Sequence, residues 1–426
     1  MDNIVLRTES IKKIQIVILL GAPLTAQNYE RVGIPYLSKH FEVLVFDCIE
    51  WLGRNNKEVK YKKASWDKIL PIKSKLELED QIKKISPQYA IDFIGFGNLT
   101  LDICIILAKY NVKFVIQKTG SLPIPNISLR IKTIVIKFFR ENKTGSLVDL
   151  KNINPTVEES ISIGRLGKIF GKIHAKLRRV TILIKLKSLP NYIGLIAGYK
   201  SLDPFTRSSN PIIWIGSHDY HTFYKAKNEL ALNKDPQING PFILFIDDAL
   251  VNASDWTLLG LPAPVTGKTY YAALNAFFEK IESVYDMPVK IAGHPNSIVD
   301  ENYSSKIGGR SVIYDSTAKL VLQSSLVLVH GSTATSFAVL ARKPILHITT
   351  LELDQTDYGL HVRVMSKSLG TELIFIDIYN RKKIDLKEIP IDECKYRLYE
   401  VNFLCNERSS EIEPWGGLVD FIKNSA

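Results

Sequence analysis

A cluster of hydroxyl side chains lies in the run His330-Gly331-Ser332-Thr333-Ala334-Thr335-Ser336, directly after the apolar segment Leu326–Val329. This pattern predicts a strand, a turn of small residues and then a helix. Helix N-terminal amides together with hydroxyl groups bind anions readily, whereas capping alone needs a single Ser or Thr. We therefore expect a phosphate-binding site whose ligands come from the following residues: Gly331, Ser332, Thr333, Thr335 and Ser336.

A histidine stands between glycine and proline in Gly293-His294-Pro295, which follows the apolar segment Val289–Ala292. Glycine lets a ligand approach the backbone closely, and proline restricts the chain after the histidine. An imidazole at such a strand end can donate a hydrogen bond or a proton to a leaving phosphate. We therefore expect His294 and Pro295 to belong to the same donor site.

Two carboxylates, Asp247 and Asp248, follow the apolar segment Phe242–Ile246. A carboxylate at a strand end can act as a general base towards an acceptor hydroxyl, although aspartate is also common as a cap of a turn. The sequence contains no Walker A loop, GxGxxG, HExxH, GxSxG or CxxC motif. Since the phosphate loop also lacks clustered carboxylate ligands, we expect neither a metal nor another cofactor.

The elements that carry these loops alternate between short apolar strands and helices. The first 117 residues contain four such strands, and a second series begins near residue 212. This alternation predicts α/β architecture with parallel sheets covered on both faces. We predict two Rossmann-like doubly wound domains facing a cleft, with ligands at the carboxyl ends of the strands.

The domain boundaries follow from the length of 426 residues and from the change of pattern between the two series. We predict an N-terminal domain over residues 1–235, which binds the acceptor and carries a basic insertion over 120–200. A donor-nucleotide domain follows over 236–405. The tail over 406–426 is expected to pack back on the N-terminal domain.

The net charge of +11 is concentrated in one stretch. Residues 130–187 contain 14 Lys plus Arg against 4 Asp plus Glu, a local charge of +10. Within it, residues 165–187 form a basic amphipathic pattern that includes Lys168, Lys172, Lys176 and Arg179. Such a helix can lie on an anionic membrane surface. The alternative is a helix that packs on the N-terminal domain and leaves its charges in solvent.

The remainder of the chain is close to neutral, and its aromatic residues lack the spacing of a base-stacking module, so we expect no nucleic-acid partner. No apolar run approaches the length of a membrane span, and the N-terminus lacks the pattern of a secretory signal. We expect a cytoplasmic protein that can associate peripherally with the inner membrane surface.

Taken in order, the acidic pair, the His-Pro motif and the Ser/Thr cluster resemble those of a group of bacterial glycosyltransferases, the sialyltransferases and Kdo transferases. This resemblance implies the GT-B arrangement for the two domains. The stretch from about Ile212 to Pro344 is also similar to surface-polysaccharide biosynthesis proteins, some of them linked to pseudaminic acid transfer. The pieces that match are His218-Asp219-Tyr220, Asp255-Trp256, Tyr270-Tyr271 and Lys290-Ile-Ala-Gly-His-Pro-Asn296.

This resemblance implies a glycosyltransferase that uses a CMP-activated nonulosonic acid of the pseudaminic, legionaminic, sialic or Kdo type. The acceptor would be a surface glycan or a lipid-linked glycan. In the sialyltransferases, however, the acidic motif ends in glycine and lies in the N-terminal domain. Here Ala249 follows the pair, and Asp248 lies 46 positions before His294. Asp219, with His218 and His221 on either side, is therefore a second candidate for the catalytic base.

Three other functions fit the same architecture. The first is a UDP-hexosamine 2-epimerase, and the second is a transferase of CDP-activated polyol phosphate. The third is a non-catalytic glycan-binding protein. The basic stretch and the clustered hydroxyls favour transfer over epimerisation.

Overall fold

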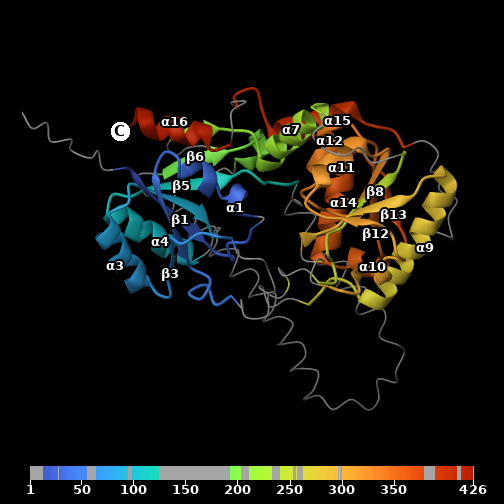
Figure 1. Ribbon diagram of the computed structural model, residues 1–426, viewed down its shortest axis with the longest axis horizontal. Coiled ribbons are helices and arrows are strands. Elements are labelled where there is room, and N and C mark those ends of the chain that lie inside the picture. The colour runs from blue at the N-terminus through green and yellow to red at the C-terminus, as the bar shows by residue number, and fades with distance from the viewer. Residues whose placement is uncertain are drawn as a thin grey trace, which may run out of the picture.

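A computed structural model describes the two predicted domains and the segments that join them (Figure 1). The structure describes residues 13–26, 28–54, 64–94, 98–123, 192–202, 211–232, 240–252, 256, 262–295, 297, 300–378, 389–409 and 414–425. The basic segment over 165–187, with Lys168, Lys172, Lys176 and Arg179, lies outside these residues.

The first domain is built on a parallel sheet with the strand order β3-β2-β1-β4-β5-β6-β7. Its strands are β1 (Gln15–Leu20), β2 (Glu42–Asp47), β3 (Ile69–Pro71), β4 (Tyr89–Phe93), β5 (Lys113–Lys118), β6 (Tyr192–Ile196) and β7 (Ile212–Trp214). The short elements α1 (Asn28–Arg31), α2 (Ile34–Leu37) and η1 (Tyr199–Ser201) accompany the longer helices α3 (Lys75–Ile85) and α4 (Asn98–Lys109). Apolar side chains are buried on both faces of this sheet, as parallel strands require.

The second domain repeats this design with the strand order β10-β9-β8-β11-β12-β13. Its strands are β8 (Ile243–Ile246), β9 (Val289–Ala292), β10 (Val312–Ile313), β11 (Leu326–Val329), β12 (Ile345–Thr349) and β13 (Leu373–Phe375). All strand pairs in both sheets are parallel. Each order is that of a Rossmann fold, so the predicted pair of Rossmann-like domains is confirmed.

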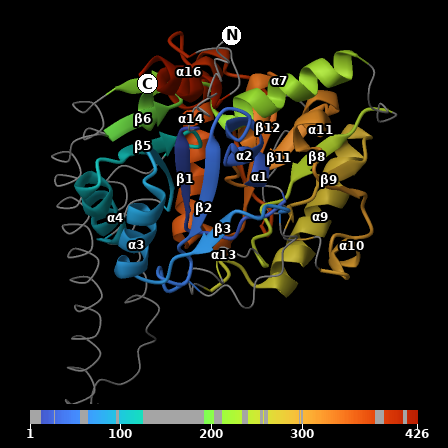
Figure 2. The same ribbon diagram turned by 60° about the vertical axis from the view of Figure 1, so that its left-hand side comes forward.

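Two layers of helices cover the second sheet (Figure 2). The helix α9 (Gly267–Tyr285) contributes Phe277, Phe278 and Ile281 to one face, where α10 (Tyr303–Lys306) and α13 (Leu351–Asp354) also lie. The other face is covered by α7 (His218–Ala231), α11 (Thr317–Gln323), α12 (Thr335–Leu340), α14 (Asp357–Leu369) and α15 (Glu393–Tyr399). The helix α7 thus packs on the second domain, through Phe223 and Ala226. It does so although it lies within residues 1–235, the range predicted for the N-terminal domain.

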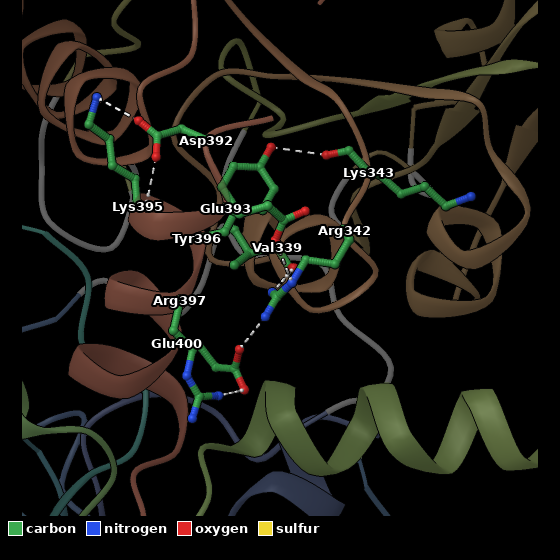
Figure 3. Close-up of polar contacts among 9 residues, drawn as sticks. All are labelled: Val339, Arg342, Lys343, Asp392, Glu393, Lys395, Tyr396, Arg397 and Glu400. Carbon is green, nitrogen blue, oxygen red and sulfur yellow. Dashed lines mark hydrogen bonds and ion pairs between the residues drawn. The ribbon is translucent and has the colours of Figure 1, made fainter. Parts of the chain in front are cut away.

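Polar contacts anchor α15 to the end of α12 before the chain leaves the second domain (Figure 3). The Arg342 guanidinium donates to Glu400 at 2.8 Å and to the Val339 carbonyl at 2.7 Å. The Tyr396 hydroxyl donates to the Lys343 carbonyl at 2.9 Å. Arg342 has a left-handed backbone with φ 53°, so these bonds hold a turn that a non-glycine residue adopts reluctantly.

The chain then returns to the first domain through the π-helix η4 (Glu400–Leu404) and ends in α16 (Gly416–Asn424). This return runs beside the earlier crossing between the domains. The Ser217 N–H donates to the Leu404 carbonyl at 2.6 Å, and the Ser409 hydroxyl donates to the Ile215 carbonyl at 3.0 Å. Figures 1 and 2 both place α16 beside β6, and Trp415 joins the core of the first sheet.

None of the helices in the described ranges combines the length and the hydropathy that a membrane span requires.

The contact between α16 and the first domain generates a stability prediction at Gly33. Gly33 has φ 83°, and a Cβ there would overlap the Trp415 ring. Gly53 has φ 63°, but a Cβ there would meet no atom within 4 Å. We expect Gly53→Ala to lower the free energy of unfolding by about 1 kcal/mol, from backbone strain alone, and Gly33→Ala by about 3 kcal/mol or more. Urea unfolding measures the free energy of unfolding of both variants. Equal losses in the two would mean that the overlap with the Trp415 ring adds no cost to Gly33→Ala.

Candidate functional site

The predicted site residues of the second domain lie at the carboxyl ends of adjacent strands. Asp247 and Asp248 follow β8, His294 follows β9, and Gly331 follows β11. Since β8 pairs with β9 on one side and with β11 on the other, the β8 loop lies between the other two. The strand order reverses between β8 and β11, which is where Rossmann-like domains bind their ligands.

Asp247 joins the β8 loop to the β9 loop. Its side chain is 5% exposed, and its Oδ2 accepts a hydrogen bond from the Ser297 hydroxyl at 2.8 Å. Its Oδ1 accepts from the Ala249 N–H at 2.8 Å, and the Tyr303 hydroxyl also bonds to the carboxylate. Both oxygens therefore have donors within the fold, and this arrangement favours a positioning role over that of a base.

Asp248 joins the β8 loop to the β11 loop and to α14. Its Oδ2 accepts from the Gly331 N–H at 3.1 Å and from the Tyr358 hydroxyl at 2.6 Å. Burial, reinforced by the neighbouring Asp248, raises the pKa of the Tyr358 hydroxyl far above its ordinary range, so this hydroxyl stays a donor. Asp248 therefore holds the start of the turn that follows β11, residues 331–336, which we call the hydroxyl turn.

Some polar groups of the turn after β11 form hydrogen bonds within the fold, and others lie at the surface. The Thr335 N–H donates to the Ser332 carbonyl at 3.1 Å, and the Ser336 N–H donates to the Thr333 carbonyl at 3.0 Å. The Ala334 N–H donates to the Ser332 hydroxyl at 3.3 Å. The first amides of α12 therefore close the turn itself. The amides of Ser332 and Thr333 have no partner within the described part of the chain, and Thr333 is exposed.

The two remaining hydroxyls of the turn are buried. Thr335 is 0% exposed, and its Oγ1 has no hydrogen-bond partner among the described residues. Ser336 is 1% exposed and lies 3.3 Å from the Tyr399 hydroxyl. It also hydrogen-bonds to the carboxylate of Asp219. Ser336 therefore connects the turn to α7 and is placed to orient Asp219 rather than to meet a ligand.

The two histidines that follow strands of the second sheet differ in exposure. His294 is half-buried and begins a tight turn in which the Ser297 N–H donates to its carbonyl at 2.8 Å. Pro295 follows it, also half-buried. His330 is fully buried: its Nδ1–H donates to the Ile348 carbonyl at 2.6 Å, and its Nε2 accepts from the Tyr270 hydroxyl at 2.9 Å. Burial lowers the pKa of His330, so this imidazole is a neutral part of the core.

Asp219 lies apart from the acidic pair, in the first turn of α7, which Ser217 caps. Burial raises the pKa of its carboxyl to about 6, against the opposing effects of the Arg31 guanidinium and the bond with Ser336. Burial likewise lowers the pKa values of His218 and His221 to about 4, so both imidazoles are neutral at pH 7. A carboxyl that titrates near neutral pH is suited to take a proton from an acceptor hydroxyl.

Sequence reasoning missed three residues near these groups: Arg31, Tyr358 and His361. Arg31 ends α1, and nothing in its neighbourhood along the chain marks it as a site residue. Tyr358 and His361 are three positions apart on α14, a spacing that places both on one helix face. This spacing is the sequence signal that could have identified them as a pair of site residues. His361 Nε2 donates to the Gly331 carbonyl at 3.0 Å, so this face of α14 meets the hydroxyl turn.

No group of three or more His, Cys, Asp or Glu side chains within the described ranges is arranged to hold a metal ion.

Comparisons with known proteins give similarity in fold. No family model matches the chain, and no curated protein matches it. Among solved structures, UDP-GlcNAc 2-epimerase from Methanocaldococcus jannaschii is 13% identical with a TM-score of 0.44, and the match covers 91% of this chain and 99% of that one. The same enzyme from Neisseria meningitidis is 12% identical with a TM-score of 0.43, covering 97% and 99%. A variant of the wall teichoic acid polymerase TagF is 10% identical with a TM-score of 0.47, covering 97% and 89%.

The raised pKa of Asp219 makes a prediction about stability. Folding moves this pKa from its ordinary value of 3.8 to about 6, so the folded state binds the proton more tightly. The carboxyl's contribution to stability is therefore complete below pH 4 and is lost as the pH rises through 6. We expect Asp219→Asn to be more stable than the wild type at pH 7.5, by up to about 3 kcal/mol for a shift of about 2 units. This advantage should disappear near pH 4.

Urea unfolding at a series of pH values provides the measurement. Asp67→Asn, at an exposed position of the first domain, is the matched control and should follow the wild-type curve. A constant difference between Asp219→Asn and the wild type at every pH would show that the charge of Asp219 costs no stability.

Proposed function

We propose that this protein is a glycosyltransferase that moves a nonulosonic acid, of the pseudaminic, legionaminic, sialic or Kdo type, from a CMP-activated donor. The acceptor would be a surface glycan or a lipid-linked glycan. The observation that carries the proposal is the double attachment of the β8 loop, through Asp247 to Ser297 and through Asp248 to Gly331. This attachment holds the His294 loop and the hydroxyl turn at one edge of the second sheet.

The hydroxyl turn offers the donor phosphate a set of hydrogen-bond donors. The amides of Ser332 and Thr333 are available, and both side chains reach the surface. CMP leaves with a single phosphate, whose developing charge must be stabilised by protein groups. In many enzymes, fixed hydrogen-bond donors aimed at such a charge make the largest single contribution to the stabilisation of the transition state. His294 would bind or protonate the phosphate from the neighbouring loop.

Asp219 is the base in this proposal if the reaction inverts the anomeric configuration, whereas a retaining reaction requires no such base. Its pKa of about 6 leaves the carboxylate ionised at pH 7, and this pKa is close enough to the working pH for the group to accept a proton. Asp247 and Asp248, which the sequence also offered as catalytic groups, would position the two donor loops. The bonds of Asp247 to Ala249 and Ser297 support this division of roles.

A further part of the proposal concerns the setting of the reaction. The acceptor would be reached at the inner membrane surface, to which Lys168, Lys172, Lys176 and Arg179 would hold a cytoplasmic protein. Each basic side chain near an anionic bilayer contributes about 1 kcal/mol, and less at high salt. This part rests on the sequence alone.

The donor site predicts the effect of removing His294. His294→Ala should reduce the rate of transfer from a CMP-sugar by about 100-fold or more, because one transition-state donor is lost. The melting temperature should change little, since the side chain is half-buried on a loop. His40→Ala, on the first domain beside Lys423, is the matched control and should retain full activity.

Melting temperatures measured with different nucleotides test which nucleotide the donor site binds. CMP should bind the wild type and raise its melting temperature more than CDP or UDP at equal concentration. A clear preference for UDP, with epimerisation of a UDP-hexosamine, would replace the proposed function. Wild-type turnover in His294→Ala would remove this residue from the donor site.

The hydroxyl turn also predicts that transfer needs no metal. Its groups are amides and hydroxyls, whereas divalent cations prefer carboxylate ligands. The activity of the purified enzyme should therefore persist in excess EDTA. Loss of activity that magnesium or manganese restores would contradict this part of the proposal.

A further inference from the structure

His361 connects the hydroxyl turn to the first domain. It lies on α14 of the second domain, and its Nε2 donates to the Gly331 carbonyl at 3.0 Å. The imidazole also interacts with the backbone of Pro123. Proline has no N–H, so the Pro123 carbonyl can only accept, and the neutral ring has one N–H for the two carbonyls. Pro123 follows β5 of the first domain, and its neighbour Leu122 packs against the core of the second domain. One side chain thus contacts both domains at the edge of the candidate donor site.

The Gly331 peptide is held from two sides by residues outside the turn. Its N–H donates to Asp248, and its carbonyl accepts from His361. The His361 ring also lies directly over the glycine, since a Cβ there would come within 2.8 Å of the ring Cδ2. Asp248 fixes the turn relative to β8, whereas His361 fixes it relative to the first domain.

We propose that His361 is a positioning residue that sets the hydroxyl turn against the first domain, so that donor binding depends on this interdomain contact. The inference rests on the proposed function for the identity of the ligand. The groups that would meet the donor, Ser332 and Thr333, come directly after Gly331. A shift of the Gly331 peptide therefore displaces their amides, while the reacting groups His294 and Asp219 lie on other elements.

Two substitutions separate the hydrogen bond from the packing of the ring. His361→Leu fills similar space without a donor, and His361→Gln retains amide donors near the position of Nε2. Lys367→Gln, at an exposed position on the same helix, is the matched control. Steady-state kinetics with a CMP-sugar and hydrogen exchange of the unliganded protein are measured for each variant.

We expect His361→Leu to raise the KM for the donor by about tenfold while kcat changes less than about twofold, since the loss of one or two hydrogen bonds acts on binding. His361→Gln should recover most of this loss. In His361→Leu, amide exchange should become faster both in residues 331–336 and in the first-domain segment ending at Leu122. Lys367→Gln should behave as the wild type.

Three results would overturn the inference: a wild-type KM in His361→Leu, equal losses in the Leu and Gln variants, or faster exchange confined to residues 331–336. Failure of the proposed function has a different signature. If the wild type neither binds nor turns over a CMP-sugar, the donor assignment falls. The exchange pattern of the three variants still decides whether His361 couples the turn to the first domain.

Discussion

The hydrogen bonds of Asp247 and Asp248 hold the second domain's loops in one arrangement. Two adjacent carboxylates at the end of a central strand would repel each other and lose solvation if they had no donors. Here Asp247 is satisfied by Ser297 and Ala249, and Asp248 by Gly331 and Tyr358. The donors come from different loops and from α14. Satisfying the pair therefore requires these segments to meet at the point where the strand order reverses.

The chain's two crossings between the domains impose a second constraint. The outgoing segment at Ile215–Ser217 and the returning segment at Leu404–Ser409 are joined by hydrogen bonds. A Cβ at Gly198 would overlap the backbone at Asn402, so the first domain also approaches the returning segment closely. Beyond the crossing, Trp415 and Leu418 are buried in the first core. The end of the chain thus ties the second domain to the first.

This tie brings groups from both domains to the junction. Arg31 of the first domain lies within electrostatic reach of Asp219 and His218 on α7. Lys225 of α7 lies 3.9 Å from Glu30, an exposed pair that contributes little to stability. Burial at this junction raises the pKa of Asp219, whereas the acidic pair is satisfied by neutral donors inside one domain. The carboxylates thus differ in chemistry because they differ in surroundings.

The sequence by itself determined the two α/β domains, because short apolar strands such as Leu326–Val329 and amphipathic helices such as Tyr270–Tyr285 carry their own periodicity. It also marked the loops after β8, β9 and β11, because polar residues that follow an apolar strand stand out in the chain. Only the tertiary structure decided which of these residues serve the fold. Ser336 looks like a ligand in the sequence, but its partner Tyr399 lies 63 positions away. The bridge from His361 to Gly331 and Pro123 depends on how two domains dock, and hydrogen bonds between such distant residues leave no local pattern to read.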